Sequence, residues 1–160
     1  MKTRSQKIAH AAYQQVVGRE SQKTKEENKK YGALVHKLPM MILQNGLAQT
    51  TGFLLSKQEA HFKDVLENLR VVYQQVDPDL KAELEKSHQP VNPESKCLDD
   101  NKALHQYIIE SDLYPMMKLT REGLEIAGWL RRYVQGILKI DATGESENEP
   151  EEDKKPEVQS

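Results

Sequence analysis

The residue types that most often carry chemistry are sparse in this sequence, which has five histidines and one cysteine in 160 residues. No two histidines stand three or four positions apart, so no pair would offer two metal ligands from one face of a helix. Glu85 and His88 form one Glu-x-x-His pair, whereas a di-iron centre in a helical bundle needs two such pairs and two further carboxylates. The sequence therefore predicts no metal site and no cofactor.

Nucleophilic and phosphate-binding chemistry are equally poorly supported. Cys97 follows Lys96 in a polar stretch, and the lysine would lower the thiol pKa only slightly without an identifiable base nearby. Acidic residues such as Glu59 and Asp64 fall on expected polar faces, whereas a general acid or base is usually surrounded by apolar side chains. No Lys-Ser/Thr follows Gly52, so the glycines of "GLAQTTGFL" are not a phosphate loop. We predict that the chain is not an enzyme.

The charge distribution is asymmetric, although the net charge is only −2. Residues 141–160 carry a net charge of −6, and the remaining 140 residues carry +4. Within these, residues 1–37 contribute +6 and residues 113–140 contribute +3. Basic ends indicate a polyanion or an acidic protein surface as partner. Ordinary solvated helix faces are the alternative explanation.

Apolar residues recur at helical spacing through most of the chain, and no segment predicts a strand. The expected helices cover 8–17, 31–42, 47–55, 62–76, 104–108 and 119–137, with a short turn at 80–84. The predicted fold is therefore all-α, an irregular bundle of about six helices. Two prolines within 87–97 indicate a loop.

Three local features should shape this bundle. Pro39 lies inside an apolar helical run, where a kink or a restart of the helix is expected. Asn45-Gly46 supplies a residue that tolerates positive φ and should join two packed helices. The pattern from Ser56 to Glu59 predicts a capping box for the next helix. Gly46 and Gly52 are further expected to let neighbouring helices approach closely.

The chain should form one domain at 1–140, followed by a disordered acidic tail at 141–160. That tail has almost no large apolar residue to offset the entropy of ordering. The first residues lack the apolar core of a signal peptide, and the longest apolar run, 38–43, is too short to span a membrane. A single cysteine fits a reducing compartment, so we expect a cytoplasmic protein without a membrane partner.

Three blocks of sequence together resemble a known family. They are "RSQKIAHAAYQQV" at 4–16, "KYGALVHKLPMMILQNGLAQTTGFLLSK" at 30–57 and "LTREGLEIAGWLRRYVQGIL" at 119–138. In this order and spacing they resemble the small α-helical subunit of the type III-B CRISPR effector, the Cmr complex. The most specific part is the second block, reinforced by the Trp-Leu-Arg-Arg segment of the third. Residues 77–103 match only loosely.

The resemblance implies a non-catalytic subunit of an RNA-guided surveillance complex in antiviral defence. In that family the partners are the backbone and large subunits, further copies of the small subunit in a filament, and guide and target RNA. The small subunits flank the groove in which guide pairs with target and hold the strands through basic surfaces. Positions that we expect to face RNA are Arg4, Lys7, Lys30, Lys37, Lys57, Arg131 and Arg132. Trp129 is a candidate for base stacking, although its spacing from Ile126 favours a half-buried core position.

Two other functions stay open on the sequence alone. One is a stand-alone regulator that binds duplex DNA, although no segment shows a three-helix reader with a basic recognition helix. The other is a structural adaptor whose charges lie at contacts between protein subunits.

Overall fold

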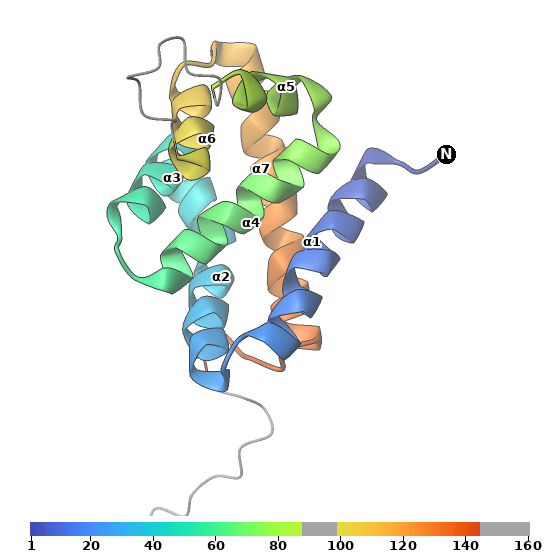
Figure 1. The fold of residues 1–160 in the computed structure, drawn as a ribbon, viewed down its shortest axis with the longest axis vertical. Helices are drawn as coiled ribbons and strands as arrows, with labels where there is room; N and C mark the ends of the chain where they lie inside the picture. Colours follow the sequence, from blue (N-terminus) through green and yellow to red (C-terminus); the bar gives the residue numbers. More distant parts are fainter. Residues whose placement is uncertain (88–98, 145–160) are drawn as a thin grey trace, which may run out of the picture.

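The computed structural model describes residues 1–87 and 99–144, and these form seven helices without an extended strand (Figure 1). The helices are α1 Arg4–Gln22, α2 Lys25–Asn45, α3 Leu47–Ser56, α4 Ala60–Val76, α5 Pro78–Lys86, α6 Asp100–Ile109 and α7 Leu113–Gly136. The predicted all-α class is confirmed. The sequence predicted six helices, and the additional one is α5. The short turn expected at 80–84 is a full helix that begins with Pro78 and is capped by the Asp77 side chain.

Capping boxes begin the first two helices, where the sequence analysis did not place them. Thr3 and Gln6 cap each other's backbone N–H groups at the start of α1, and Thr24 and Glu27 do the same for α2. The capping box predicted at Ser56–Glu59 is wrong. Ser56 is the last residue of α3, since the apolar stripe of that helix continues to its end, and its hydroxyl donates to the Phe53 carbonyl.

The predicted hairpin of two helices joined at Asn45-Gly46 is confirmed. Gly46 has φ 81°, and its N–H donates to the Ile42 carbonyl at 2.9 Å, so it ends α2 and begins α3. Pro39 does not restart the helix, because α2 runs as one element from Lys25 to Asn45. Leu38 and Ile42 are both buried, so packing on either side of the proline holds the turn that lacks one backbone hydrogen bond.

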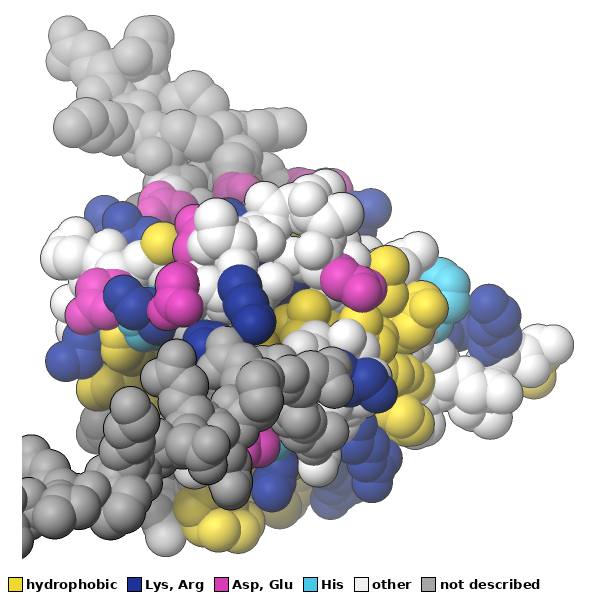
Figure 2. Space-filling model, turned by 90° about the horizontal axis from the view of Figure 1, so that it is seen from below, with side chains coloured by type: hydrophobic (Ala, Val, Ile, Leu, Met, Phe, Trp, Pro, Cys, Tyr) yellow, Lys and Arg dark blue, Asp and Glu magenta, His cyan; other side chains and the backbone are white. Residues whose placement is uncertain are grey.

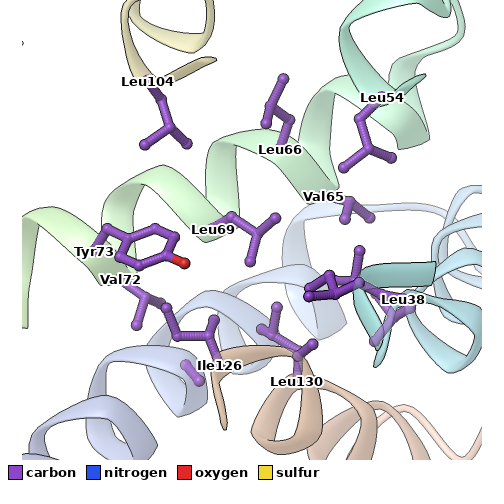
Figure 3. Close-up of a cluster of buried hydrophobic side chains, with 14 of the residues drawn as sticks. Leu38, Leu54, Val65, Leu66, Leu69, Val72, Tyr73, Leu104, Ile126 and Leu130 are labelled. Atoms are coloured by element: carbon purple, nitrogen blue, oxygen red, sulfur yellow. The ribbon is translucent and has the colours of Figure 1, made fainter. Parts of the chain in front are cut away.

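Helix α4 lies at the centre of the bundle and packs against all six other helices. Its predicted apolar stripe is confirmed, with Val65, Leu66, Leu69, Val72, Tyr73 and Val76 all buried. Around Leu69, side chains from α2, α3, α6 and α7 converge on this helix (Figure 3). One continuous core therefore fixes the relative positions of α1, α2 and α7, on which most of the predicted basic site residues lie.

Close contacts occur at one of the two expected glycines, Gly52, and at two others. A Cβ atom on Gly32 would lie 2.6 Å from the Ile140 side chain, and one on Gly123 would lie 2.6 Å from the Tyr73 hydroxyl. Gly46 has no atom within 4 Å of such a Cβ, so its function is its positive φ rather than a close approach. A Cβ atom on Gly52 would lie 3.3 Å from the His105 ring, so the close approach expected there is confirmed, between α3 and α6.

After α7 the chain folds back onto α2. Ile140 is buried beside Gly32, and its carbonyl lies 2.9 Å from His36 Nε2. Residues 141–144 follow as a turn that ends with buried Gly144, so the domain boundary at 140/141 stays a prediction. Residues 145–160, which are part of the disordered tail predicted at 141–160, lie outside the described residues, as do residues 88–98, which contain His88 and Cys97.

Candidate nucleic-acid interface

All seven predicted RNA-facing residues are exposed. Arg4 and Lys7 lie on α1, Lys30 and Lys37 on α2, Lys57 directly after α3, and Arg131 and Arg132 on α7. Helices α1 and α2 both pack against α7, so most of these cations belong to one three-helix part of the molecule. Lys57 is separate, beside the exposed Phe53 ring at 5.1 Å.

The cations do not form one patch, because those beside or on α7 lie at two levels of this helix and Lys57 lies after α3. Arg4 lies against Glu122 in the first half of α7, whereas Arg131 and Arg132 belong to its last turns. The nine residues from Glu122 to Arg131 correspond to about 14 Å along the axis of α7. On the end of the molecule seen in Figure 2, lysine and arginine side chains are interspersed with acidic and apolar ones. An RNA strand would therefore meet separate positive positions rather than a continuous basic strip.

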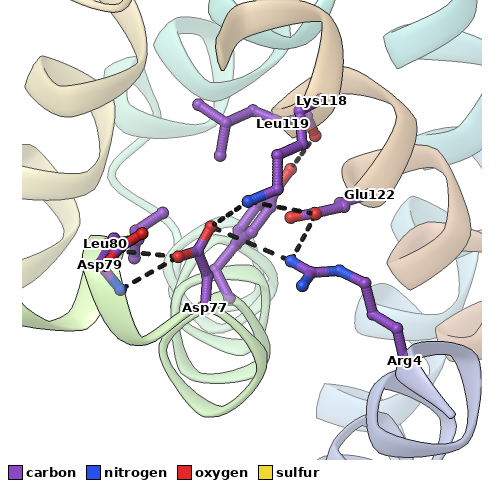
Figure 4. A network of polar contacts seen from close by, with 8 residues as sticks. Arg4, Asp77, Asp79, Leu80, Lys118, Leu119 and Glu122 are labelled. Carbon is purple, nitrogen blue, oxygen red and sulfur yellow. Dashed lines mark hydrogen bonds and ion pairs between the residues drawn. The ribbon is translucent and has the colours of Figure 1, made fainter.

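Arg4 is held by buried acidic side chains (Figure 4). Its guanidinium pairs closely with Glu122 and lies 3.9 Å from Asp77, while Lys118 lies 3.1 Å from Asp77 and 4.0 Å from Glu122. The side chains of Asp77 and Glu122 are only 6% and 7% exposed, whereas that of Arg4 is 44% exposed. These four residues, here called the Arg4 cluster, join the start of α1 to α4, α5 and α7.

The two acids of the Arg4 cluster are shifted in opposite directions. Burial is the largest influence on Asp77, but the backbone N–H of Leu80 and the Lys118 ammonium outweigh it and hold the pKa of this carboxyl below its usual value. Burial raises the pKa of Glu122, and the attraction of Arg4 and Lys118 only partly offsets this effect. One Glu122 oxygen, Oε2, is buried without a hydrogen-bond partner in the described residues. Arg4 thus neutralises acids of its own chain.

Arg132 has a different environment, formed by aromatic rings. Its guanidinium lies 5.0 Å from the centre of the Trp129 ring, and Trp129 stacks on Tyr133 with 5.6 Å between centroids. Tyr133 meets Tyr13 of α1 edge to face at 5.5 Å. We call Tyr13, Trp129, Arg132 and Tyr133 the aromatic cluster. Trp129 is half-buried, as predicted, while Tyr13 is 47% exposed.

Tyr13 and Tyr133 were missed as candidate site residues. Tyr133 stands four positions after Trp129, which places the two rings on one helix face; that spacing was a usable signal. The partnership with Tyr13 required the packing of α1 on α7, which no local pattern reveals. Exposed rings beside an arginine are the surface on which nucleic-acid bases commonly stack.

Arg19 is the buried cation of the described residues. It donates to Asn28 at 3.2 Å and to Asp64 at 2.9 Å, and its guanidinium lies 3.7 Å from the Tyr31 ring centre. Burial raises the pKa of Tyr31 to about 12, so this hydroxyl stays protonated at neutral pH. Part of the +6 charge of residues 1–37 therefore lies inside the protein and is unavailable to a partner.

Across residues 1–87 and 99–144, the structure contains no group of three or more His, Cys, Asp or Glu side chains that could hold a metal ion. Glu85 is described, but its sequence partner His88 is not. No helix in these same ranges is long and apolar enough to cross a membrane.

A family model, a curated protein and a solved structure match this chain. The family model for "CRISPR-associated protein (Cas_Cmr5)" matches residues 4–137. The "CRISPR system Cmr subunit Cmr5" of Thermus thermophilus is 30% identical over 140 residues, covering 87% of this chain and 99% of that protein. The crystal structure of a CRISPR-associated Cmr5 family protein from the same organism superposes with a TM-score of 0.60 at 26% identity, covering 86% of this chain and 99% of that one. This chain therefore belongs to the Cas_Cmr5 family of CRISPR-associated proteins.

Proposed function

We propose that this protein is the small, non-catalytic subunit of a type III-B Cmr complex, and that it contacts guide and target RNA through exposed basic side chains. The observation that carries the RNA contact is a set of six exposed cations that form no ion pair with any residue of 1–87 or 99–144. They are Lys7, Lys30, Lys37, Lys57, Arg131 and Arg132.

Such side chains suit phosphate groups because they need not break an internal ion pair first. Contacts to phosphates give affinity and position without reading sequence, which is what a subunit beside a guide–target duplex requires. The aromatic cluster adds a surface for one or two bases where Tyr13 and Trp129 reach solvent. Arg4 is the weakest candidate of the seven, because two buried acids already neutralise it.

Assembly supports the same function. The curated relative is a subunit of a Cmr system, and we propose that the backbone subunits, the large subunit and further copies of this chain are its partners. Repeated weak contacts along a filament would raise the effective affinity of each copy for RNA. Cleavage chemistry would then belong to other subunits of the complex.

The test is a charge reversal at three of these six cations, with a control of equal change in charge. The triple variant K30E/R131E/R132E should lower the slope of log affinity against log salt for single-stranded RNA by about two, at roughly 0.7 per lost phosphate contact. The control K81E/K86E/K102E makes the same change in net charge at exposed lysines of α5 and α6, and it should leave most of that slope in place. Binding would be measured by fluorescence anisotropy at several salt concentrations.

Three results would contradict the proposal in distinct ways. Equal slopes for the two triple variants would show that RNA does not contact Lys30, Arg131 and Arg132. Unchanged RNA binding with lost assembly into the Cmr complex would favour the structural adaptor. Tighter binding of duplex DNA than of RNA would favour the regulator.

A further inference from the structure

A hollow beside the starts of α4 and α6 brings together three lysines, of which Lys57 alone belongs to the predicted RNA-facing set. Lys57 directly follows α3, Lys63 lies in the first turn of α4, and Lys102 lies in the first turn of α6. The hollow has a volume of about 250 Å³ and is also lined by buried Leu54 and Leu66. We call it the α3–α6 hollow. No local pattern in the sequence marks it, because the packing of α3 against α4 and α6 creates it.

The three lysines of the α3–α6 hollow are available to a ligand. Their side chains are exposed, and none forms an ion pair with any residue of 1–87 or 99–144. Asp99 is the acid among the described lining residues, and its carboxylate accepts from the Asn101 N–H at 3.3 Å as the cap of α6. Three lysines and one aspartate give the lining a net charge of +2.

Two further acids directly follow lining residues in the chain, and Arg70 pairs with both. Its guanidinium lies 3.6 Å from Glu67 and 3.6 Å from Asp100, and its Nε donates to the Asn101 side chain at 3.4 Å. These three charges sum to −1, so the lining and its surroundings together keep a net charge of +1. An anionic ligand is therefore favoured in the hollow.

An exposed aromatic ring borders the same lysines. The Lys57 ammonium lies 5.1 Å from the centre of the Phe53 ring, and Phe53 is 40% exposed. Phe53 meets Phe62 edge to face with 5.8 Å between centroids, a contact that helps to orient the ring. Proteins hold single-stranded nucleic acid by this combination, in which cations neutralise phosphates and a ring stacks on a base.

We propose that the α3–α6 hollow is a second contact for an RNA strand, with phosphate groups held by Lys57, Lys63 and Lys102 and a neighbouring base stacked on Phe53. This inference rests on the proposed function, that the chain contacts RNA. Figure 1 shows the connection between α3 and α4 at the left edge of the bundle and α1 at the right edge. The aromatic cluster lies between α1 and α7, so one subunit holds RNA at two separate places.

The site has a consequence for the control variant K81E/K86E/K102E. Lys102 contributes one of the three contacts in the α3–α6 hollow, so this control should lose about 0.7 of the salt slope, as one phosphate contact to a single strand requires. The triple variant K30E/R131E/R132E should lose about two. Most of the slope therefore remains in the control.

The experiment removes two lysines of the hollow that lie outside the predicted RNA-facing set. K63Q/K102Q should lower the slope of log affinity against log salt for a short single-stranded RNA by about 1.4, at roughly 0.7 per lost phosphate contact. The matched control K81Q/K86Q makes the same change in charge at exposed lysines of α5 and should leave the slope in place. Fluorescence anisotropy at several salt concentrations would measure both, on the full-length protein.

A second pair of variants tests the ring separately from the charges. F53L should weaken RNA binding about fivefold, near the lower end of what one stacked base contributes. The salt slope should stay unchanged in F53L, because no charge is lost. L43A removes an exposed apolar side chain of α2 and should leave both affinity and slope unchanged.

The results separate this site from the contacts of the proposed function. Equal slopes for K63Q/K102Q and K81Q/K86Q would overturn the α3–α6 site, and a slope still lowered in K30E/R131E/R132E would then leave the proposed function standing. A slope lowered only in K63Q/K102Q would support this site and contradict the contacts at Lys30, Arg131 and Arg132. An equal loss of affinity in F53L and L43A would overturn base stacking on Phe53.

Discussion

Arg4 and Arg132 were predicted for the same function, yet the structure places them in opposite environments. Arg4, at the start of α1, lies between the buried carboxylates of Asp77 and Glu122. Arg132, in the last turns of α7, lies over the Trp129 ring and forms no ion pair within the described residues. The Arg4 cluster joins four helices, whereas the aromatic cluster lines the outer seam of α1 and α7. An arginine on an amphipathic helix can therefore serve either the fold or a partner, and its neighbours in space decide which.

This difference has a physical basis in desolvation. A buried carboxylate is costly unless a cation neutralises it, so Glu122 and Asp77 require Arg4 and Lys118. An aromatic face attracts a guanidinium only weakly and leaves its N–H groups available for phosphate. The Arg4 cluster should accordingly respond to mutation mainly in stability, and the aromatic cluster mainly in RNA binding.

The largest expected effect is on the Arg4 cluster through Asp77. Its side chain caps α5 by accepting from the N–H groups of Asp79 and Leu80 at 3.1 and 3.2 Å, and it also binds Lys118. D77A should lower the free energy of unfolding by about 2 kcal/mol, since both a helix cap and buried charge-assisted hydrogen bonds are lost. Urea unfolding followed by circular dichroism would measure this loss.

Two controls divide that loss into its parts. D77N can still cap the helix but loses the charge, so its loss of stability should be about half of that in D77A. D79A changes an exposed acid of the same turn and should stay within about 0.5 kcal/mol of the natural protein. If D77A were as stable as D79A, the Arg4 cluster would not be a structural element.

A smaller stability effect should separate the two arginines directly. R4M leaves Glu122 with Lys118 at 4.0 Å as its remaining cation, and because Arg4 is partly exposed we expect a loss of about 1 kcal/mol. R132M removes an exposed contact with a ring and should cost less than about 0.5 kcal/mol. The same unfolding experiment compares them, and equal losses would contradict the distinction drawn between the clusters.

When RNA binding is measured, mutation of Arg132 should have a larger effect than mutation of Arg4. R132A should weaken binding of single-stranded RNA about threefold, equivalent to the roughly 0.7 kcal/mol expected of one exposed phosphate or ring contact. R4A should have little effect, since its charge is already neutralised. R132K keeps the charge but not the planar group, so an intermediate affinity would indicate that contact with Trp129 contributes. A stronger loss of affinity in R4A than in R132A would contradict the assignment of RNA binding to the aromatic cluster.

The smallest effect is the pH dependence of the Arg4 cluster. The pKa of Asp77 is below its ordinary value of 3.8 in the folded protein, so its contribution to stability is present above pH 3.8 and is lost as pH falls through the lowered pKa. The pKa of Glu122 is above its ordinary value of 4.5, so its contribution is present below pH 4.5 and is lost as pH rises through the raised pKa. Relative to the natural protein, E122Q should therefore gain stability as the pH rises from below 4.5 through the folded pKa of Glu122. Urea unfolding between about pH 4 and pH 8 would measure the difference in free energy of unfolding between E122Q and the natural protein. A difference that does not change with pH would contradict the raised pKa of Glu122.

Much of the fold could be predicted because it is encoded locally. Apolar spacing located six of the seven described helices, all but α5, and Asn45-Gly46 specified the α2–α3 joint through the conformational freedom of one glycine. Errors arose where two local signals competed. At Ser56 the capping pattern was outweighed by the apolar stripe of α3. At Pro39 the restart, one of the two outcomes expected there, does not occur, because burial on both sides of the proline outweighs the lost hydrogen bond.

The candidate site was predictable only as a set of charges. Sequence position located Arg4 and Arg132 on helices, but it could not show that Asp77, distant in the chain, lies beside Arg4. The pairing of Tyr13 with Tyr133 likewise depends on how α1 packs against α7. Contacts between segments far apart in sequence have no local signal, so charge counts alone overestimate the surface available to RNA.

The contact between Ile140 and Gly32 has a practical consequence for anyone who shortens or fuses this protein. The family match ends at residue 137, which suggests a natural place to cut, yet Ile140 fills the notch that the missing Cβ of Gly32 leaves on α2. A chain cut at 137 would open an apolar groove on α2 to water and leave His36 without its acceptor carbonyl. Tags and fusion partners are better attached beyond Gly144, where the last described turn is already complete.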